Sequence, residues 1–159
     1  THCISSAASD VYKRQMPLSA VIGKVPIMDS LASPANATTT AANPICCAGG
    51  LATLDEVERL NLPQRSQQLG VFAKTQFLEL QQDFPIIKQV RMIGLNGGIE
   101  FEATKSAFVT ALSEYCFEHG LIMISTMDHI LRFQPPLVIT EEEIKTGIAI
   151  IRDGLQKLA

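Results

Sequence analysis

Two stretches in the second half of the chain carry apolar residues at every third or fourth position, which is the spacing of a helix that buries one face. A helix over residues 64–83 carries the stripe Leu69, Ala73, Phe77, Leu80 and Phe84. A second helix, which starts just after Thr140, carries the stripe Ile144, Ile148, Ile151, Leu155 and Leu158. Thr140, with Glu143 three residues later, predicts a capping box at the start of the second helix. Both stripes indicate packing against a core and not a cofactor site.

Short apolar runs lie between these two helices and predict strands. They cover residues 86–92, 97–102, 121–125 and 130–134. The first two are joined through a glycine-containing segment, which indicates a hairpin. Thr104 predicts the cap of a further helix, which Gly120 stops, and Phe108, Leu112 and Tyr115 are expected on one face of it.

The first half of the chain predicts fewer elements. Residues 18–25 are apolar and partly β-branched, which indicates a buried strand that a proline ends before a turn. Residues 31–43 are rich in Ala, Ser, Thr and Asn and are expected to form a loop. Asn43 then fits the N-cap, and Pro44 the first position, of a helix that runs to about residue 60. The free N–H groups of a helix start, with a neighbouring Thr hydroxyl, can hold a phosphate, although most capped helices bind nothing.

Arg132 is the cationic residue of the otherwise apolar stretch 130–140. Alternation along a strand puts Leu131 and Phe133 on the core side and Arg132, with Ile130 and Gln134, on the other side. A guanidinium held there suits a carboxylate, because its planar fork can donate two parallel hydrogen bonds. The alternative is a structural arginine that a neighbouring Asp or Glu neutralises, and the local pattern alone favours that alternative.

The composition limits the classes of function. The chain has 159 residues, 47% of them hydrophobic, which is enough for one sizeable core or for parts of two domains. With 13 Lys and Arg against 16 Asp and Glu the net charge is −3, without a basic stripe, which argues against nucleic-acid binding. No apolar run approaches the roughly 20 residues of a membrane span, so a cytoplasmic protein is expected. Cys3, Cys46, Cys47 and Cys116 lack metal-ligand spacing and are expected to be reduced thiols.

Residues 1–15 differ from the rest of the chain. Their sequence, THCISSAASDVYKRQ, shows no sustained helical or strand period. It resembles the translated adaptor sequence found at the ends of some metagenomic assemblies, so we expect a non-native segment. The natural sequence is then expected to resume near Met16, as the tail of a longer protein.

Three ordered motifs resemble the C-terminal part of class III pyridoxal-phosphate-dependent aminotransferases. They are MPLSAVIGKVPIMD at residues 16–29, TTAANP at residues 39–44 and HILRFQPPLVITEEEI at residues 129–144. The resemblance implies an α/β protein of the PLP-dependent transferase fold type I, of which this chain is the C-terminal portion, mainly the small α+β domain. It also implies that residues 16–60 are the end of the large cofactor-binding domain with a connecting helix, and that residues 61–159 are the small C-terminal domain.

The resemblance further implies the site residues. Thr39 matches the family threonine that contacts the phosphate of pyridoxal 5'-phosphate (PLP) in the neighbouring subunit, and Arg132 matches the arginine that pairs with the substrate's α-carboxylate. In this register Asp10 stands where the Schiff-base lysine belongs, and Lys13 is out of register. No catalytic residue is therefore expected in this chain, because amino-group transfer depends on that lysine. A homodimer or a dimer of dimers is expected for the full-length protein.

The implied function is transfer of an amino group between an amino acid or ω-amino acid and a 2-oxo acid. Within the class, TTAANP, LRFQPPLVIT and YCFEHG at residues 115–120 look closest to bacterial isoleucine 2-epimerases, and next to 4-aminobutyrate aminotransferases. Amino-acid 2-epimerisation therefore stays open as an alternative. A second alternative is a non-catalytic α+β binding module, which a natural start codon near Met16 would support.

Overall fold

The computed structural model describes residues 18, 22–30 and 43–158 of the chain. The chain divides into two compact units, Thr1–Leu60 and Asn61–Ala159. The boundary expected between the two domains lies at the same place in the sequence. That these units are the end of a large domain and a small domain remains a prediction.

The first unit contains the helices α1 (Val25–Met28) and α2 (Pro44–Arg59). Helix α2 starts as predicted. Asn43 is its N-cap, and the side-chain oxygen of Asn43 accepts a hydrogen bond from the backbone N–H of Ile45 at 3.0 Å. Pro44 follows as the first helical residue, where its missing N–H leaves no helical hydrogen bond unmade.

The strand predicted over residues 18–25 is wrong where the structure describes it. Val25 begins helix α1, and Ile22 is 93% exposed instead of buried. Pro26 lies in the first turn of this helix, where proline is tolerated, and does not end a strand. The error has a simple cause, since a short apolar run does not by itself distinguish a strand from a helix. Residues 19–21, and the loop predicted before Asn43, lie outside the described residues.

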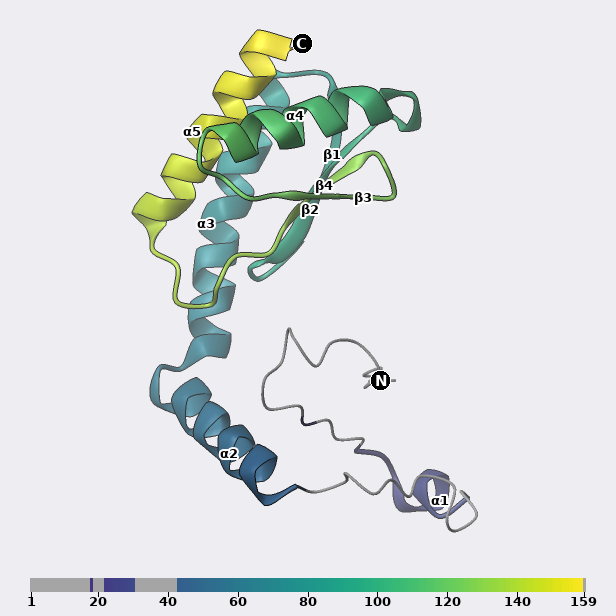
Figure 1. The fold of residues 1–159 in the computed structure, drawn as a ribbon, viewed down its shortest axis with the longest axis vertical. Helices are drawn as coiled ribbons and strands as arrows, with labels where there is room; N and C mark the ends of the chain where they lie inside the picture. The colour runs from purple at the N-terminus through teal and green to yellow at the C-terminus, as the bar shows by residue number, and fades with distance from the viewer. Residues whose placement is uncertain (1–17, 19–21, 31–42, 159) are drawn as a thin grey trace. The chain divides into compact units, whose positions relative to one another are not determined.

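The second unit is an α+β fold built on an antiparallel sheet (Figure 1). In the described residues the sheet has four strands in the spatial order β1 (Ile87–Ile93), β2 (Asn96–Phe101), β4 (Ile130–Phe133) and β3 (Ile124–Thr126). The helical elements are α3 (Leu62–Asp83), the 3-10 turn η1 (Ala103–Lys105), α4 (Ser106–Glu118) and α5 (Glu141–Leu158). Strands β1 and β2 form the predicted hairpin, and β4 lies between β2 and β3. The strand that carries Arg132 therefore occupies an inner position.

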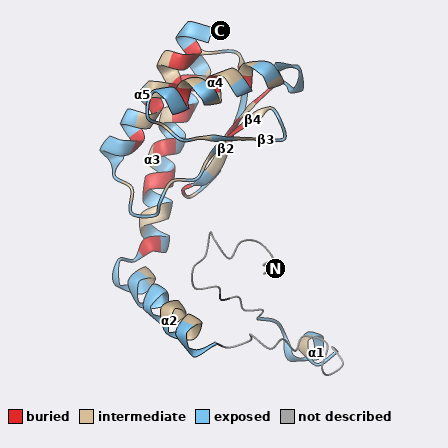
Figure 2. Ribbon diagram, viewed as in Figure 1, coloured by how far each residue is buried: buried red, intermediate tan, exposed pale blue. Residues whose placement is uncertain are grey.

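The helices and one face of the sheet enclose a single hydrophobic core, as the buried positions in Figure 2 show. The predicted stripe of α3 is buried from Leu69 to Leu80, and that of α5 is buried from Ile144 to Leu155. The sheet and α4 contribute Ile87, Val90, Ile99, Phe101, Leu131, Val109, Leu112 and Cys116. Both predicted stripes are thus confirmed except at their last residues, since Phe84 is half-buried just after the end of α3 and Leu158 is 39% exposed.

Helix α4 differs from its prediction in two respects. Thr104 does not cap it, because residues 103–105 form the turn η1 and the helix begins at Ser106 without a side-chain cap. Its buried face consists of Val109, Leu112 and Cys116, whereas Phe108 and Tyr115 are half-buried. The helix starts one residue later than predicted, which does not change the face on which a residue lies, so the second error lies in the choice of the buried face. The predicted stop is confirmed, because Gly120 has φ of 87° directly after the helix.

Helix α5 starts at the predicted capping box. The backbone N–H and the hydroxyl of Thr140 each donate a hydrogen bond to the Glu143 carboxylate at 2.8 Å, and the N–H of Glu143 donates to the Thr140 hydroxyl oxygen at 3.3 Å. The backbone hydrogen bond first, and then the hydroxyl, lower the pKa of Glu143, because both favour its charged form. The box fixes the helix start at the end of the loop that leaves β4.

Candidate functional site

Arg132 lies on the face of the sheet that is turned away from the core; we call this the open face. The register pairs Arg132 with Gly98 of β2 and with Ile124 of β3, and it pairs Gly98 with Arg91 of β1. These four residues form one row across the sheet. The neighbours of Arg132 along β4 face the other way, since Leu131 is fully buried and Phe133 is half-buried. The predicted alternation along this strand is confirmed.

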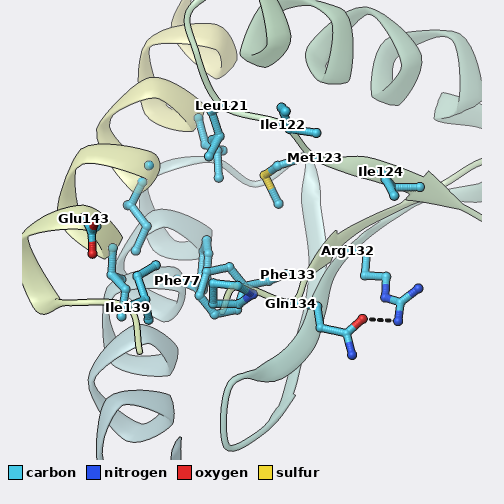
Figure 3. A pocket seen from close by; sticks show the side chains of 15 residues that line it. Phe77, Leu121, Ile122, Met123, Ile124, Arg132, Phe133, Gln134, Ile139 and Glu143 are labelled. Carbon is cyan, nitrogen blue, oxygen red and sulfur yellow. Dashed lines mark hydrogen bonds between the residues drawn. The ribbon is translucent and has the colours of Figure 1, made fainter. Parts of the chain in front are cut away.

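Arg91 and Arg132 share the open face but have different partners. The guanidinium of Arg91 lies 2.7 Å from the carboxylate of Glu100, so this arginine is neutralised. Arg132 instead donates a hydrogen bond to the side-chain oxygen of Gln134, which Figure 3 shows as a dashed line. Within the described part of the chain no carboxylate oxygen lies within 4 Å of the Arg132 guanidinium. The glutamine amide carries no charge, so the positive charge of Arg132 remains available to an anion.

A cavity of about 200 Å³ adjoins Arg132. Its wall comes from α3, α5, β3, β4 and the segments that lead into β3 and out of β4, and Figure 3 shows Arg132 and Gln134 at one side of it. The apolar side chains of the wall include Phe77, Met123, Phe133, Ile139, Ile144 and Ile148. A second hollow of about 350 Å³ lies on the open face between Arg91 and Arg132. Arg132 thus borders both an apolar cavity and an open hollow with polar and apolar residues in its lining.

The loop between β4 and α5 forms part of the cavity wall and is held by Arg65 of α3. The Arg65 guanidinium donates hydrogen bonds to three successive carbonyl oxygens, those of Leu137 at 3.3 Å, Val138 at 3.2 Å and Ile139 at 2.6 Å. This loop starts at Gln134, the partner of Arg132, and ends at the α5 capping box. Arg65 therefore fixes the segment that lies between the candidate site and the next helix.

The remaining predicted site residues lie outside the described residues. Thr39, the expected phosphate contact, is one of them, as are Asp10 and Lys13 at the expected lysine position. The helix start that follows Thr39 in sequence is described. There the side-chain oxygen of Asn43 accepts a hydrogen bond from the backbone N–H of Ile45. The roles assigned to Thr39 and Arg132 both remain predictions.

Other candidate chemistry is limited in the described residues. No group of three or more His, Cys, Asp or Glu there is placed to hold a metal ion. The described helices include none with the length and apolar character needed to cross a membrane. Cys46, Cys47 and Cys116 are free thiols. Burial raises the pKa of the Cys116 thiol to about 11, which keeps it protonated at neutral pH.

Of the two residues that shape this site, the sequence placed one correctly. Alternation along the strand puts Gln134 on the same side as Arg132, and the hydrogen bond between the two side chains agrees with this. Arg65 gave no local signal. Its acceptors lie 72 to 74 positions further along the chain, and which of the chain's arginines reaches them depends on how α3 packs.

Comparison with known proteins identifies the family. A family model described as class III aminotransferase matches residues 12–155. The chain belongs to the class III aminotransferases. The predicted family is thereby confirmed, and with it membership of a group of PLP-dependent enzymes. The match begins four residues before Met16, inside the segment expected to be non-native, and the origin of residues 1–15 stays a prediction.

The relatives of this class III aminotransferase chain are named for more than one activity. Isoleucine 2-epimerase of Lentilactobacillus buchneri is 47% identical over 145 residues, covering 87% of this chain and 32% of the relative. The probable 4-aminobutyrate aminotransferase of Bacillus subtilis is 32% identical over 152 residues, covering 89% of this chain and 34% of the relative. The chain thus spans about a third of the length of the curated relatives it matches.

A solved structure confirms the predicted fold. Acetylornithine aminotransferase from Elizabethkingia anophelis has a TM-score of 0.74 and 31% identity, covering 82% of this chain and 34% of that one. The chain is therefore a portion of a PLP-dependent transferase fold, and its described second unit is α+β, as expected.

Proposed function

We propose that the full-length protein transfers an amino group between an amino acid or ω-amino acid and a 2-oxo acid, and that Arg132 binds the substrate's carboxylate. The observation that carries the proposal is Arg132 itself, an exposed guanidinium beside a cavity whose partner in the described residues is the neutral Gln134. Membership of the class III family supports the reaction class. The relatives named for 4-aminobutyrate and acetylornithine transamination support it as well.

The geometry around Arg132 favours a carboxylate over a structural role. The two structural arginines nearby are satisfied, since Arg91 on the same face is paired with Glu100 at 2.7 Å and Arg65 donates to three backbone carbonyls, whereas Arg132 has one neutral acceptor among the described residues. Gln134 takes one N–H of Arg132 and leaves most of the five guanidinium donors free. Two parallel donors can then bind both oxygens of a carboxylate, which a lysine ammonium cannot do.

The residues that the structure describes fit the substrate's carboxylate and not the cofactor itself. Bound PLP supplies an electron sink that stabilises negative charge at the substrate's Cα. We assign its phosphate contact to Thr39, on the motif TTAANP. Asp10, at the register position of the Schiff-base lysine, is a carboxylate and cannot take that lysine's place. Residues 1–159 alone are therefore expected to show no turnover when PLP, an amino donor and a 2-oxo acid are added, and turnover under these conditions would contradict the assignment.

Amino-acid 2-epimerisation is the second candidate function. The observation that favours it is the 47% identity with an isoleucine 2-epimerase, against 32% with the aminotransferase of Bacillus subtilis. Both reactions begin by removing the Cα proton and need the same carboxylate contact. They differ in where the proton returns, and Arg132 serves either one.

One assay of the full-length protein, expressed from the complete reading frame with PLP, separates the two functions. Incubation with L-isoleucine and no 2-oxo acid forms D-allo-isoleucine if the protein is an epimerase. A new amino acid that forms only when a 2-oxo acid is present identifies an aminotransferase. A protein that does neither across aliphatic amino acids, ornithine and 4-aminobutyrate would overturn the proposal.

A homodimer or dimer of dimers in the cytoplasm is proposed for the full-length protein. The support is the expected role of Thr39, whose phosphate partner belongs to the neighbouring subunit of a dimer. Light scattering of the PLP-loaded protein should then give twice or four times the subunit mass. A monomer with full activity would contradict the role of Thr39 as well as the assembly.

A further inference from the structure

The sheet of the second unit has two edges that differ in their protection. In the described residues the edge strands are β1 and β3 (Figure 1). β1 carries Lys88 and Arg91, and both of these side chains pair with Glu100. A register shift between Ile87 and Gln89 also interrupts the pairing of β1 with β2. Charged side chains and irregularities of this kind keep an edge strand from pairing with another chain. β1 is therefore a protected edge.

The other edge, β3, has neither a charge nor a register shift. β3 itself has three residues, but the uncharged sequence extends beyond it. Residues 121–127 read LIMISTM and contain no charged residue, no proline and no glycine. Ile122 is 79% exposed and Ile124 is 61% exposed. On the side of β3 that faces away from β4, none of the described strands pairs with it. An apolar and uncharged edge is a template for a further strand.

The segment that leads into β3 is already held in place. The hydroxyl of Ser113 in α4 donates a hydrogen bond to the carbonyl oxygen of Met123 at 2.9 Å. Leu121 and Met123 pack against the hydrophobic core. Little further ordering is therefore needed when another strand binds, and this lowers the entropic cost of association.

The sequence of this edge fits a second copy of itself. Antiparallel pairing about a two-fold axis at Ile124 places the two Ile124 side chains opposite each other on the open face. The other residue pairs are then Met123 with Ser125, and Ile122 with Thr126. No charged residue faces its own copy in this arrangement, so the repulsion between like charges that opposes self-pairing is absent.

We propose that β3 is a self-association surface, at which a second copy of this chain extends the antiparallel sheet across a two-fold axis. This inference goes beyond the proposed amino-group transfer and does not depend on Arg132. It also concerns a different segment from Thr39, on which the proposed dimer rests. Because the paired strands are short, the interface belongs to the size class of weak complexes, with a Kd of the order of 0.1 mM. Association stops at the dimer, since the other edge, β1, is protected.

Sedimentation of the whole 159-residue chain tests the proposal. We expect monomers at about 5 μM and mostly dimers at about 0.5 mM, as a Kd near 0.1 mM requires. Hydrogen exchange of the amides of residues 122–126 should be slower at the higher concentration. Ile124→Lys places two like charges opposite each other and should raise the Kd at least about tenfold. Ile93→Lys makes the same change at an isoleucine of β1 that is 88% exposed, and it should associate like the wild type. Circular dichroism checks that each variant is folded.

Four results would overturn the proposal. The first is a chain that stays monomeric at the higher concentration, and the second is growth beyond the dimer. The third is an equal effect of the two lysine variants, or association that leaves the exchange of residues 122–126 unchanged, because the contact would then lie on another surface. The fourth is slow exchange of these amides already in the monomer, which would show that another part of the same chain covers the edge. None of these measurements involves cofactor or turnover, so they leave the proposed reaction untouched.

Discussion

The backbone of Gly70 in α3 touches that of Gly94 in the turn between β1 and β2, so closely that a Cβ on Gly70 would collide with the Gly94 carbonyl group. Gly94 has φ of 56°, in the left-handed region that glycine adopts without strain. One turn earlier in α3, the hydroxyl oxygen of Ser66 accepts the N–H of Leu95 at 3.1 Å. The hairpin therefore docks its turn directly onto the helix, and this contact offsets the low helix propensity of Gly70.

Substitution of Gly70 by alanine should destabilise the second unit. The added methyl group meets rigid backbone, so the hairpin or the helix must move, which typically costs about 1–3 kcal/mol in a packed core. Gly147→Ala is the matched control, because its Cβ has ordinary contacts and alanine is the better helix former by up to about 1 kcal/mol. Urea unfolding followed by circular dichroism should show a lower midpoint for the first variant and an unchanged or higher one for the second. Equal midpoints would contradict the close approach.

The capping box of α5 should make stability depend on pH through Glu143. The pKa of Glu143 is lower in the folded chain than its ordinary value of 4.5, because the N–H and hydroxyl of Thr140 bond to the charged carboxylate. This contribution is fully present above pH 4.5 and is lost as the pH falls through the folded value. The urea midpoint of the wild type should therefore fall more between pH 7 and pH 3 than that of Glu143→Gln, which keeps the shape of the box but does not titrate. Parallel pH profiles would refute the assignment.

Cys116 should resist alkylation until the chain unfolds. Its side chain is buried, and burial raises its pKa to about 11, so little thiolate exists at pH 8. Iodoacetamide at pH 8 followed by peptide mass spectrometry should modify the half-buried Cys46 and Cys47 well before Cys116. In urea all three should react at similar rates. Early modification of Cys116 in the folded chain would show that α4 does not turn this residue into the core.

Loss of the Arg65 guanidinium should loosen the loop that leads from Gln134 to α5. Its three carbonyl acceptors lose a charged donor, and such a hydrogen bond contributes about 1.5–3 kcal/mol. The backbone N–H groups of Ile139 and Ile144 donate hydrogen bonds to the carbonyl oxygens of Pro136 and Thr140. Their hydrogen exchange should be faster in Arg65→Met. The control Arg59→Met removes an arginine whose partner, Glu56, lies in the same helix, and it should leave these amides unchanged. Equal exchange in both variants would mean that Arg65 does not hold the loop.

The elements that the sequence predicted correctly are those whose signals are local. The stripe from Leu69 to Leu80, the hairpin around Gly94, and the Thr140–Glu143 box each depend on residues within a few positions of one another. Alternation along residues 130–134 predicted the side of the strand on which Arg132 lies, and three ordered motifs predicted the family, which the match over residues 12–155 confirms.

The features that sequence missed depend on packing between distant segments. Val25 lies in a helix and not in the predicted strand, because a short apolar run does not by itself distinguish the two and packing decides between them. The buried face of α4 is set by the sheet and α5, so Cys116 and not Tyr115 enters the core. The cavity beside Arg132 is likewise lined by α3, α5 and two loop segments that are far apart in the sequence, so no local sequence pattern predicts it.

The KM of the full-length enzyme for its amino-acid substrate, compared between Arg132→Lys and Arg91→Lys, tests the central claim most directly. The two arginines lie in one row of the same sheet face, but Arg91 is paired with Glu100. Arg132→Lys keeps the positive charge but loses the two parallel N–H donors of the guanidinium. KM should therefore rise about tenfold or more, as expected for a lost charged hydrogen bond. Arg91→Lys should leave KM close to the wild-type value. An unchanged KM in Arg132→Lys, or an equal rise in both variants, would show that Arg132 does not bind the substrate's carboxylate.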